Sequence, residues 1–207
     1  DHCERSLAIY RKVLNDDNHP LVASALNNIG QVLVEQSQFQ QAVEPSEKAL
    51  HILQSILPDS GMDAWPLCNL GRIASANGEY DLAEQRLQQA IQSRTVVFGR
   101  HHIDTATAIF YLGEVYLANG EIHKAISCFT EAKSIRTDKL GSQHLDTAKS
   151  TISLFEALCR GGDLSAVDRD AAHVALETLE SKLGAGHSIC EAQRSKVEAL
   201  MELWSGH

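Results

Sequence analysis

An eight-residue pattern recurs along the chain at a nearly constant spacing. Its clearest copies are residues 23–30, 64–71 and 106–113, which begin 41 and 42 residues apart. A weaker fourth copy, 148–155, follows after another 42 residues and carries Phe155 where the others have Gly. A self-similar period of this length indicates a stack of similar units, each of which buries its apolar face against its neighbours.

Each copy has the period of a helix with one apolar face. Apolar or small residues occupy positions 1, 4, 7, 8 and 11, as in Ala23, Leu26, Ile29, Gly30 and Leu33. A short polar or glycine-containing segment then follows each copy, at residues 36–38, 77–79, 119–121 and 161–163. We therefore expect a first helix and a tight turn in every repeat.

A second helix is predicted after each turn. Small residues recur in these segments at equivalent places, namely Ala42 and Ala49, Ala83 and Ala90, and Ala125 and Ala132. The predicted second helices run on to Leu57, Phe98, Leu140 and Leu183. In the loops that follow, Asp104 and Asp146 are expected to cap the next helix. Because period-two alternation and hairpin dipeptides are almost absent, the predicted fold class is all-α.

The repeat divides the chain into six consecutive segments of a single domain, 1–207. The first is read as the second helix of a truncated repeat, with Ala8 and Ile9 matching Ala49 and Leu50; four repeats and a final capping helix follow. The expected boundaries are 1–18, 19–60, 61–101, 102–143, 144–186 (the divergent repeat) and 187–207. Because the chain begins at Asp1 and not at Met, we expect it to be a piece of a longer protein.

These helix pairs resemble tetratricopeptide repeats, and their spacing is similar to the long variant found in kinesin light chains. The segment His19-Pro20-Leu21-Val22-Ala23, followed by Leu26-Asn27-Asn28-Ile29-Gly30, resembles a family motif, and so does Gln41-Ala42-Val43-Glu44-Pro45. The resemblance implies an α-solenoid of antiparallel helix pairs, wound as a right-handed superhelix. It further implies that the first helices line a concave groove that binds a peptide or a partner protein.

A stripe at positions 2, 5, 9 and 12 of each first helix, rotated about 100° from the apolar face, is expected to line that groove. Trp and Arg are the residue types most enriched at binding hot spots. The resemblance also implies that Asn27 pairs with the backbone of an extended peptide. Two alternatives stay open: Trp65 and Phe110 pack against a neighbouring repeat or the preceding turn, or Arg72 pairs with Glu114. The candidate partner-binding residues are Asn27, Gln31, Trp65, Arg72, Phe110, Glu114 and Lys149.

Charge and composition restrict the class of partner. The formal net charge is −9 without a run of Lys and Arg, which disfavours nucleic acid, and no stretch is apolar enough for a membrane span. Five widely spaced cysteines indicate reduced thiols and a cytoplasmic, intracellular protein. The stripe lacks the Lys and Asn pairs with which chaperone-binding relatives hold a terminal carboxylate, so an internal segment with an apolar anchor is expected.

The motifs that carry catalytic chemistry are missing from the sequence. There is no phosphate-binding loop, no G-x-S-x-G and no H-E-x-x-H, so we expect neither an enzyme nor a cofactor or metal. Three functional readings remain. The preferred one is a non-enzymatic adaptor, and the alternatives are a regulatory or sensor segment of a larger enzyme or signalling ATPase and a module that self-associates through its terminal repeats.

Overall fold

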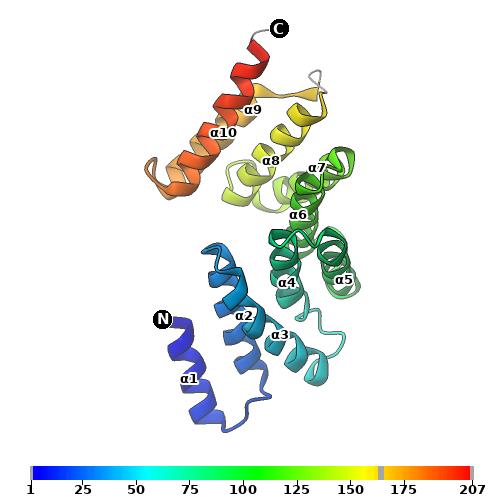
Figure 1. Ribbon diagram of the computed structural model, residues 1–207, viewed down its shortest axis with the longest axis vertical. Helices are drawn as coiled ribbons and strands as arrows, with labels where there is room; N and C mark the ends of the chain where they lie inside the picture. Colours follow the sequence, from blue (N-terminus) through cyan, green and yellow to red (C-terminus); the bar gives the residue numbers. More distant parts are fainter. Residues whose placement is uncertain (1, 163–165, 206–207) are drawn as a thin grey trace. The chain divides into compact units, whose positions relative to one another are not determined.

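The computed structural model describes residues 2–162 and 166–205, and the side chains of 203–205 lie outside the description. Every regular element in this part of the chain is a helix. Figure 1 shows the helices in order along the chain. They are α1 (His2–Leu14), α2 (Pro20–Glu35), α3 (Phe39–Ile56), α4 (Ala64–Ala76), α5 (Tyr80–Phe98), α6 (Ile103–Ala118), α7 (Ile122–Leu140), α8 (Leu145–Gly161), α9 (Arg169–Leu183) and α10 (Ser188–Ser205).

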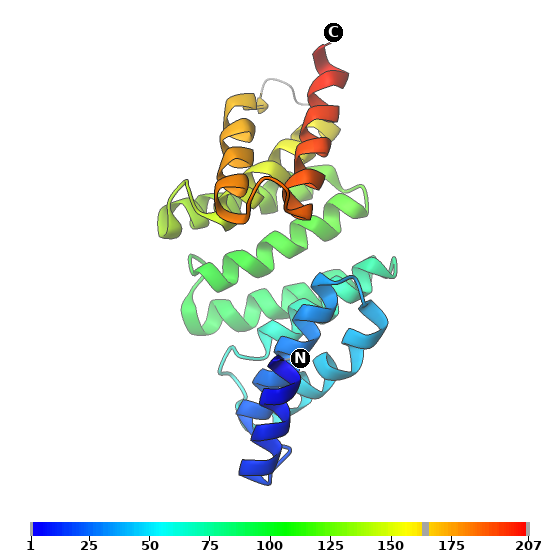
Figure 2. The same cartoon turned by 90° about the vertical axis from the view of Figure 1, so that its left-hand side faces the viewer.

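The chain divides into two compact units, 1–115 and 116–207. In the first unit, α2 packs against α3 and α4 packs against α5, and α4 also contacts both helices of the preceding pair. Both views show α4 and α5 side by side (Figure 2). In the second unit, α8 packs against α7 and α9. The predicted all-α arrangement of first and second helices is confirmed.

The turns between paired helices follow the expected chemistry. Gly78 has a φ of +79°, a left-handed conformation that glycine adopts without a steric penalty. In the corresponding turn after α2, Ser37 takes a φ of +58° instead. The fourth predicted turn is described only as far as Gly162, and Asp163 lies outside the described residues.

Histidines begin several first helices. His19 and His144 are the N-cap residues of α2 and α8, and each ring Nδ1 accepts a hydrogen bond from a main-chain N–H two residues later. His102 accepts in the same way from the N–H of Asp104. The prediction that Asp104 and Asp146 cap these helices is therefore wrong, because a histidine two residues earlier already supplies the acceptor.

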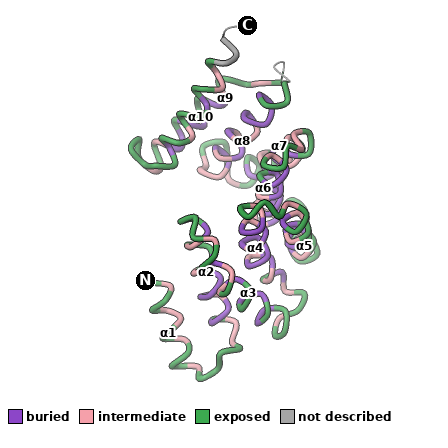
Figure 3. Tube along the Cα trace, in the orientation of Figure 1, coloured by how far each residue is buried: buried purple, intermediate pink, exposed green. Residues whose placement is uncertain are grey.

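The core of the first unit forms where the first and second helices of a pair face each other. Val22 and Leu26 of α2 pack with Ile52 and Leu53 of α3. Figure 3 shows the contrast between α4, which is mostly buried, and α1, which contains no buried residue. Two partly buried residues of α1, Leu7 and Tyr10, pack against this core.

Helix α1 meets α2 through the partly buried Leu7 and Tyr10. Ala8 and Ile9, which match the buried Ala49 and Leu50 in sequence, lie outside this contact: Ala8 is exposed and Ile9 is 58% exposed. Such uncovered apolar surface was expected of a truncated repeat.

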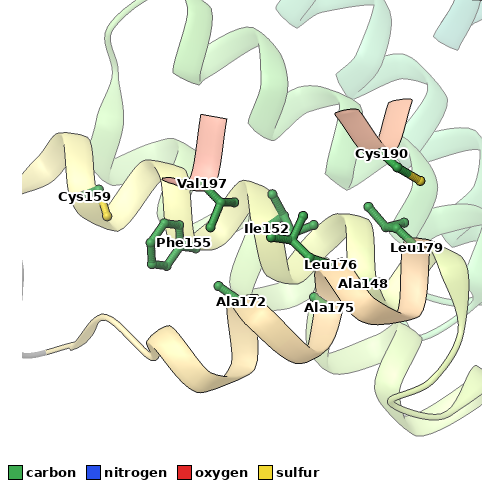
Figure 4. Close-up of a cluster of buried hydrophobic side chains, with 10 residues drawn as sticks. All are labelled: Ala148, Ile152, Phe155, Cys159, Ala172, Ala175, Leu176, Leu179, Cys190 and Val197. Atoms are coloured by element: carbon green, nitrogen blue, oxygen red, sulfur yellow. The ribbon is translucent and has the colours of Figure 1, made fainter. Parts of the chain in front are cut away.

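The first and second helices of a repeat approach each other closely where a small residue faces a large one. In the second repeat the small residue is a glycine of the first helix, and in the fourth repeat it lies on the second helix. A Cβ on Gly71 would lie 2.7 Å from Cγ of Leu87, so the two helices leave no room for a methyl group there. In the fourth repeat, Phe155 stands where Gly71 does, and Ala172 stands where Leu87 does. Phe155 and Ala172 belong to one buried cluster (Figure 4). The large and small residues have exchanged helices.

Helix α10 completes the core of the second unit. Its residues Cys190 and Val197 are buried in the same cluster as Ile152 of α8 and Leu179 of α9, as Figure 4 shows. Because α10 packs against both α8 and α9, it covers apolar surface that these helices would otherwise expose.

Candidate partner-binding surface

The predicted stripe contains both buried and accessible positions. At position 5 all four residues are buried, namely Asn27, Cys68, Phe110 and Ile152. At position 9 of the first three repeats, Gln31 and Glu114 are exposed and Arg72 is half-buried. The accessible part of the stripe in the first unit therefore centres on position 9.

Arg72 lies against an aromatic ring of the following first helix. Its guanidinium carbon is 4.6 Å from the ring centroid of Tyr111 in α6, a cation–π geometry. Tyr111 is half-buried and makes an edge contact with Phe110, with ring centroids 5.9 Å apart. The pair therefore presents a guanidinium and an aromatic ring together at the junction of two repeats. We define the first-helix surface as Gln31, Arg72, Tyr111 and Glu114.

Asn27 takes part in packing between repeats. It is 9% exposed, and its side-chain oxygen accepts a hydrogen bond of 3.1 Å from the amide of Asn69 in α4. The same amide also reaches the main-chain carbonyl of Asn27 at 3.3 Å. The side chain of Asn27 is thus already paired, and little of it is accessible to a partner.

Trp65 is half-buried and faces the second helix of its own repeat. The guanidinium of Arg94 lies 4.5 Å from the Trp65 ring and 5.4 Å from the ring of Phe98. Arg94 is 4% exposed and pairs with the carboxylate of Asp104 at 3.4 Å. Burial lowers the pKa of Arg94, and the nearby Asp104 carboxylate opposes that shift. Trp65 therefore covers a buried cation, which is a packing role.

The other candidates are placed as follows. Phe110 is only 6% exposed. Gln31 donates a hydrogen bond of 3.0 Å to Glu35 within α2. Lys149 lies in the second unit, half-buried, with its Nζ 3.9 Å from a carboxylate oxygen of Asp146. Arg72, Gln31 and Glu114 are the candidates that keep accessible surface in the first unit.

In the last repeat the stripe is covered by α10. Glu156, at position 9, is 5% exposed and pairs with Lys196 of α10 at 2.9 Å and with Arg160 at 2.6 Å. Ile152 and Cys159 are buried in the cluster to which Val197 of α10 contributes. This stretch of the stripe is an intramolecular contact.

Two further observations concern alternative chemistry. Across the described ranges, no group of three or more His, Cys, Asp or Glu side chains could hold a metal ion. None of the described helices is long and apolar enough to cross a membrane.

A family model for the tetratricopeptide repeat matches residues 1–55 and 62–138. The chain belongs to this family. Its tetratricopeptide repeats therefore form a protein-interaction module, with the fold that the residue pattern predicted. No curated protein sequence matches the chain significantly.

Several solved structures have a similar fold. BtubC (BKLC) from P. vanneervenii has a TM-score of 0.71 at 16% identity, over 97% of this chain and 81% of that one. A putative kinesin light chain from Podosopora anserina has a TM-score of 0.60 at 21% identity, over 87% and 84%. A Rap protein complexed with Competence and Sporulation Factor has a TM-score of 0.63 at 16% identity, and it is matched over 100% of this chain but 50% of its own length.

Tyr111, at position 6 of the repeat pattern, was not among the predicted candidates. The available signal was Arg72, because an arginine beside the next first helix can stack on an aromatic ring there. Stripe positions counted along a single helix do not include that neighbour.

Proposed function

We propose that the chain is a non-enzymatic adaptor that binds a polypeptide segment on the first-helix surface of residues 1–115. The observation that carries the proposal is the stacking of Arg72 on Tyr111 at a junction between repeats. Arg and Tyr are among the residues that contribute most to binding when they are held rigidly. Each holds the other in place here, so less conformational entropy is lost on binding.

The flanking charges favour a mixed-charge segment with an apolar or aromatic anchor. Arg72 offers hydrogen-bond donors for a carboxylate or a backbone carbonyl, and Glu114 is a carboxylate. Gln31 can both donate and accept, as an extended backbone requires. The net charge of −9 supports a protein partner over nucleic acid. The five free cysteines support a reducing, cytoplasmic setting.

The structural neighbours support a peptide partner by analogy. The Rap protein of similar fold was solved as a complex with Competence and Sporulation Factor. At 16% identity this likeness concerns the fold, so the binding residues of the present chain are argued from its own contacts.

The test is affinity capture from native lysate with the wild-type chain and an Arg72→Ala, Tyr111→Ala variant. The matched control is Arg86→Ala, Tyr80→Ala, which removes the same residue types from α5. All three proteins are first checked for equal helicity by circular dichroism. Proteins retained by the wild type and the control but not by the variant support the proposal, and equal retention by all three contradicts it.

Self-association is a second candidate function, because α1 exposes apolar side chains. Ile9 is 58% exposed and Val13 is 73% exposed, one helical turn apart. An Ile9→Glu, Val13→Glu variant should then remain monomeric at concentrations at which the wild-type chain forms dimers in sedimentation equilibrium. A wild-type chain that stays monomeric at every concentration would remove this candidate.

A further inference from the structure

An open hollow of about 700 Å³ lies in the first unit, and its described lining shares no residue with the first-helix surface. It is formed by the end of α3, the loop before α4, the start of α4 and one face of α5. Five glutamines line it, four of them on α5: Gln54, Gln85, Gln88, Gln89 and Gln92. We call it the glutamine hollow.

The glutamines of α5 form a continuous row of amides. Residues 85, 88, 89 and 92 fall on one face of the helix, because they are spaced by three and four. From Gln85 to Gln92 the helix rises by about 10 Å, which is the length of about three residues of extended chain. Each amide can donate and accept hydrogen bonds, so the row matches the alternating N–H and C=O groups of an extended backbone.

One amide in the row is oriented in advance. The Nε2 of Gln88 donates to Glu84 at 2.8 Å, one turn earlier on the same helix. This bond holds the Gln88 amide in one orientation and leaves its carbonyl oxygen to accept a hydrogen bond from a ligand.

The row is particular to α5 and is not required by the repeat. In α7, 42 residues later, Ser127, Thr130 and Ser134 occupy the places of Gln85, Gln88 and Gln92, and all three are exposed. The fold therefore accepts small side chains at these places, and the glutamines contribute something other than packing.

The loop beside the hollow also departs from the repeat. The loops before α2, α6 and α8 end with a histidine whose ring accepts from the helix N–H, whereas the loop before α4 ends with Asp63. The carboxylate of Asp63 accepts a hydrogen bond of 2.5 Å from Ser93 of α5 and so ties the loop to that helix. Asp59 of the same loop is exposed at the rim, with a φ of +61°.

The charges of the hollow are of one sign. Asp59 and Asp63 line it, and the lining that the structure describes contains no Lys or Arg. Because Asp63 is already bonded to Ser93, Asp59 is the carboxylate that a ligand cation can reach. A charge-assisted bond to Asp59 would add specificity to the backbone contacts made by the amides.

We propose that the glutamine hollow is a second binding site, whose ligand is an extended polypeptide segment carrying a lysine or arginine side chain. The glutamines of α5 bond the backbone of the segment, and Asp59 pairs with its cation. This site is independent of the first-helix surface, since it uses a second helix and the loop before α4. The module then holds two segments, from one partner or from two.

The test begins with a phage-displayed library of random 12-residue peptides selected on the wild-type chain. The most enriched peptide is then synthesised with blocked ends, and its affinity is measured by fluorescence anisotropy. The hollow variant is Gln85→Ser, Gln88→Thr, Gln92→Ser, which installs the residues of α7. The matched control is Gln40→Ser, Gln41→Ser, which changes two exposed glutamines of α3 outside the hollow.

The selected peptides should be rich in Lys and Arg, and the hollow variant should bind them about tenfold more weakly than the wild type, since several hydrogen bonds are lost. The control should bind as the wild type does. Asp59→Asn should also weaken binding and should reduce its dependence on salt concentration.

Three results would overturn the proposal: the selection yields no peptide, the peptides show no excess of basic residues, or the hollow variant binds them as well as the control does. Peptides that the hollow variant retains but the Arg72→Ala, Tyr111→Ala variant loses belong to the first-helix surface. That result would reject the glutamine hollow while leaving the proposed function intact.

Discussion

Asn69 donates its side-chain amide to Asn27, which lies 42 residues earlier in the sequence, and so joins two successive first helices. Both residues are buried, at 5% and 9% exposure. A buried polar pair specifies how two repeats align, since any shift along the helices leaves donors and acceptors without partners.

The contributions of the two asparagines to stability should be coupled. Asn69→Ala leaves the oxygen of Asn27 buried without its donor, so the free energy of unfolding should fall by about 1–3 kcal/mol. Adding Asn27→Ala should cost less than the sum of the two single changes, as urea denaturation of all four proteins will measure. Strictly additive losses would mean that the hydrogen bond contributes nothing to stability.

Gly71→Ala should destabilise the second repeat by about 1–3 kcal/mol, because its new methyl group would lie 2.7 Å from Leu87. Leu87→Ala on its own should also cost stability, because Leu87 is fully buried, and the double variant should lose less than the sum of the two single changes. Gly186→Ala is the control, because a methyl group there meets nothing within 4 Å. Thermal denaturation gives the order of the four variants, and a Gly71→Ala protein as stable as the Gly186→Ala control would contradict the close approach.

The histidine cap of α8 can be tested by substitution. His144→Ala removes the acceptor of the Asp146 N–H and should lower the free energy of unfolding by about 1 kcal/mol. His144→Asn keeps a side-chain acceptor and should lose less. The exposed His101, which does not begin a helix, provides the control change to Ala. If His144→Asn proves as unstable as His144→Ala, the cap is not the source of the effect.

Stability should fall in alkaline solution because of Cys68. Burial raises the pKa of its thiol to about 12 in the folded chain, whereas an exposed thiol ionises near pH 9.0. Above that pH the unfolded chain releases a proton that the folded chain keeps, so the stability contributed by the neutral buried thiol is lost as pH rises from 9 toward 12.

The comparison that isolates this effect is Cys68→Ala. Between pH 8 and pH 10 the wild type should lose about 1 kcal/mol more of its unfolding free energy than the variant, as measured by urea denaturation at each pH. Parallel losses in the two proteins would show that other groups account for the alkaline destabilisation.

The sequence was sufficient to predict the helix pairs, because their signal repeats in every unit. Positions such as Ala49 and Leu26 carry the 3.6-residue period and are buried as expected. The caps of two first helices were assigned to Asp104 and Asp146 because Asp is generally preferred at helix starts. The structure gives the acceptor role to a histidine two residues earlier in each case.

The candidate surface was predicted only in part. Adjacent residues differ by about 100° around a helix, so Phe110 and Tyr111 point in different directions, and a pattern confined to one helix does not say which of them is accessible. In the structure Phe110 is 6% exposed, whereas Tyr111 is half-buried and lies against Arg72. Likewise, Glu156 is buried because Lys196 returns from α10, 40 residues later, and no local spacing indicates such a contact.

In the second repeat a small residue of the first helix, Gly71, faces the large Leu87, whereas in the fourth repeat the large Phe155 faces the small Ala172. This exchange limits how such repeat arrays can diversify by recombination. A chimera that joined α8 to α5 would place a phenylalanine opposite a leucine, and one that joined α4 to α9 would leave a glycine opposite an alanine. Crossovers inside a hairpin would therefore create a clash or a void, whereas crossovers in the loops between hairpins keep each fitted pair intact. The pair of helices, and not the single helix, is therefore the segment of this chain that recombination can exchange without disturbing the packing.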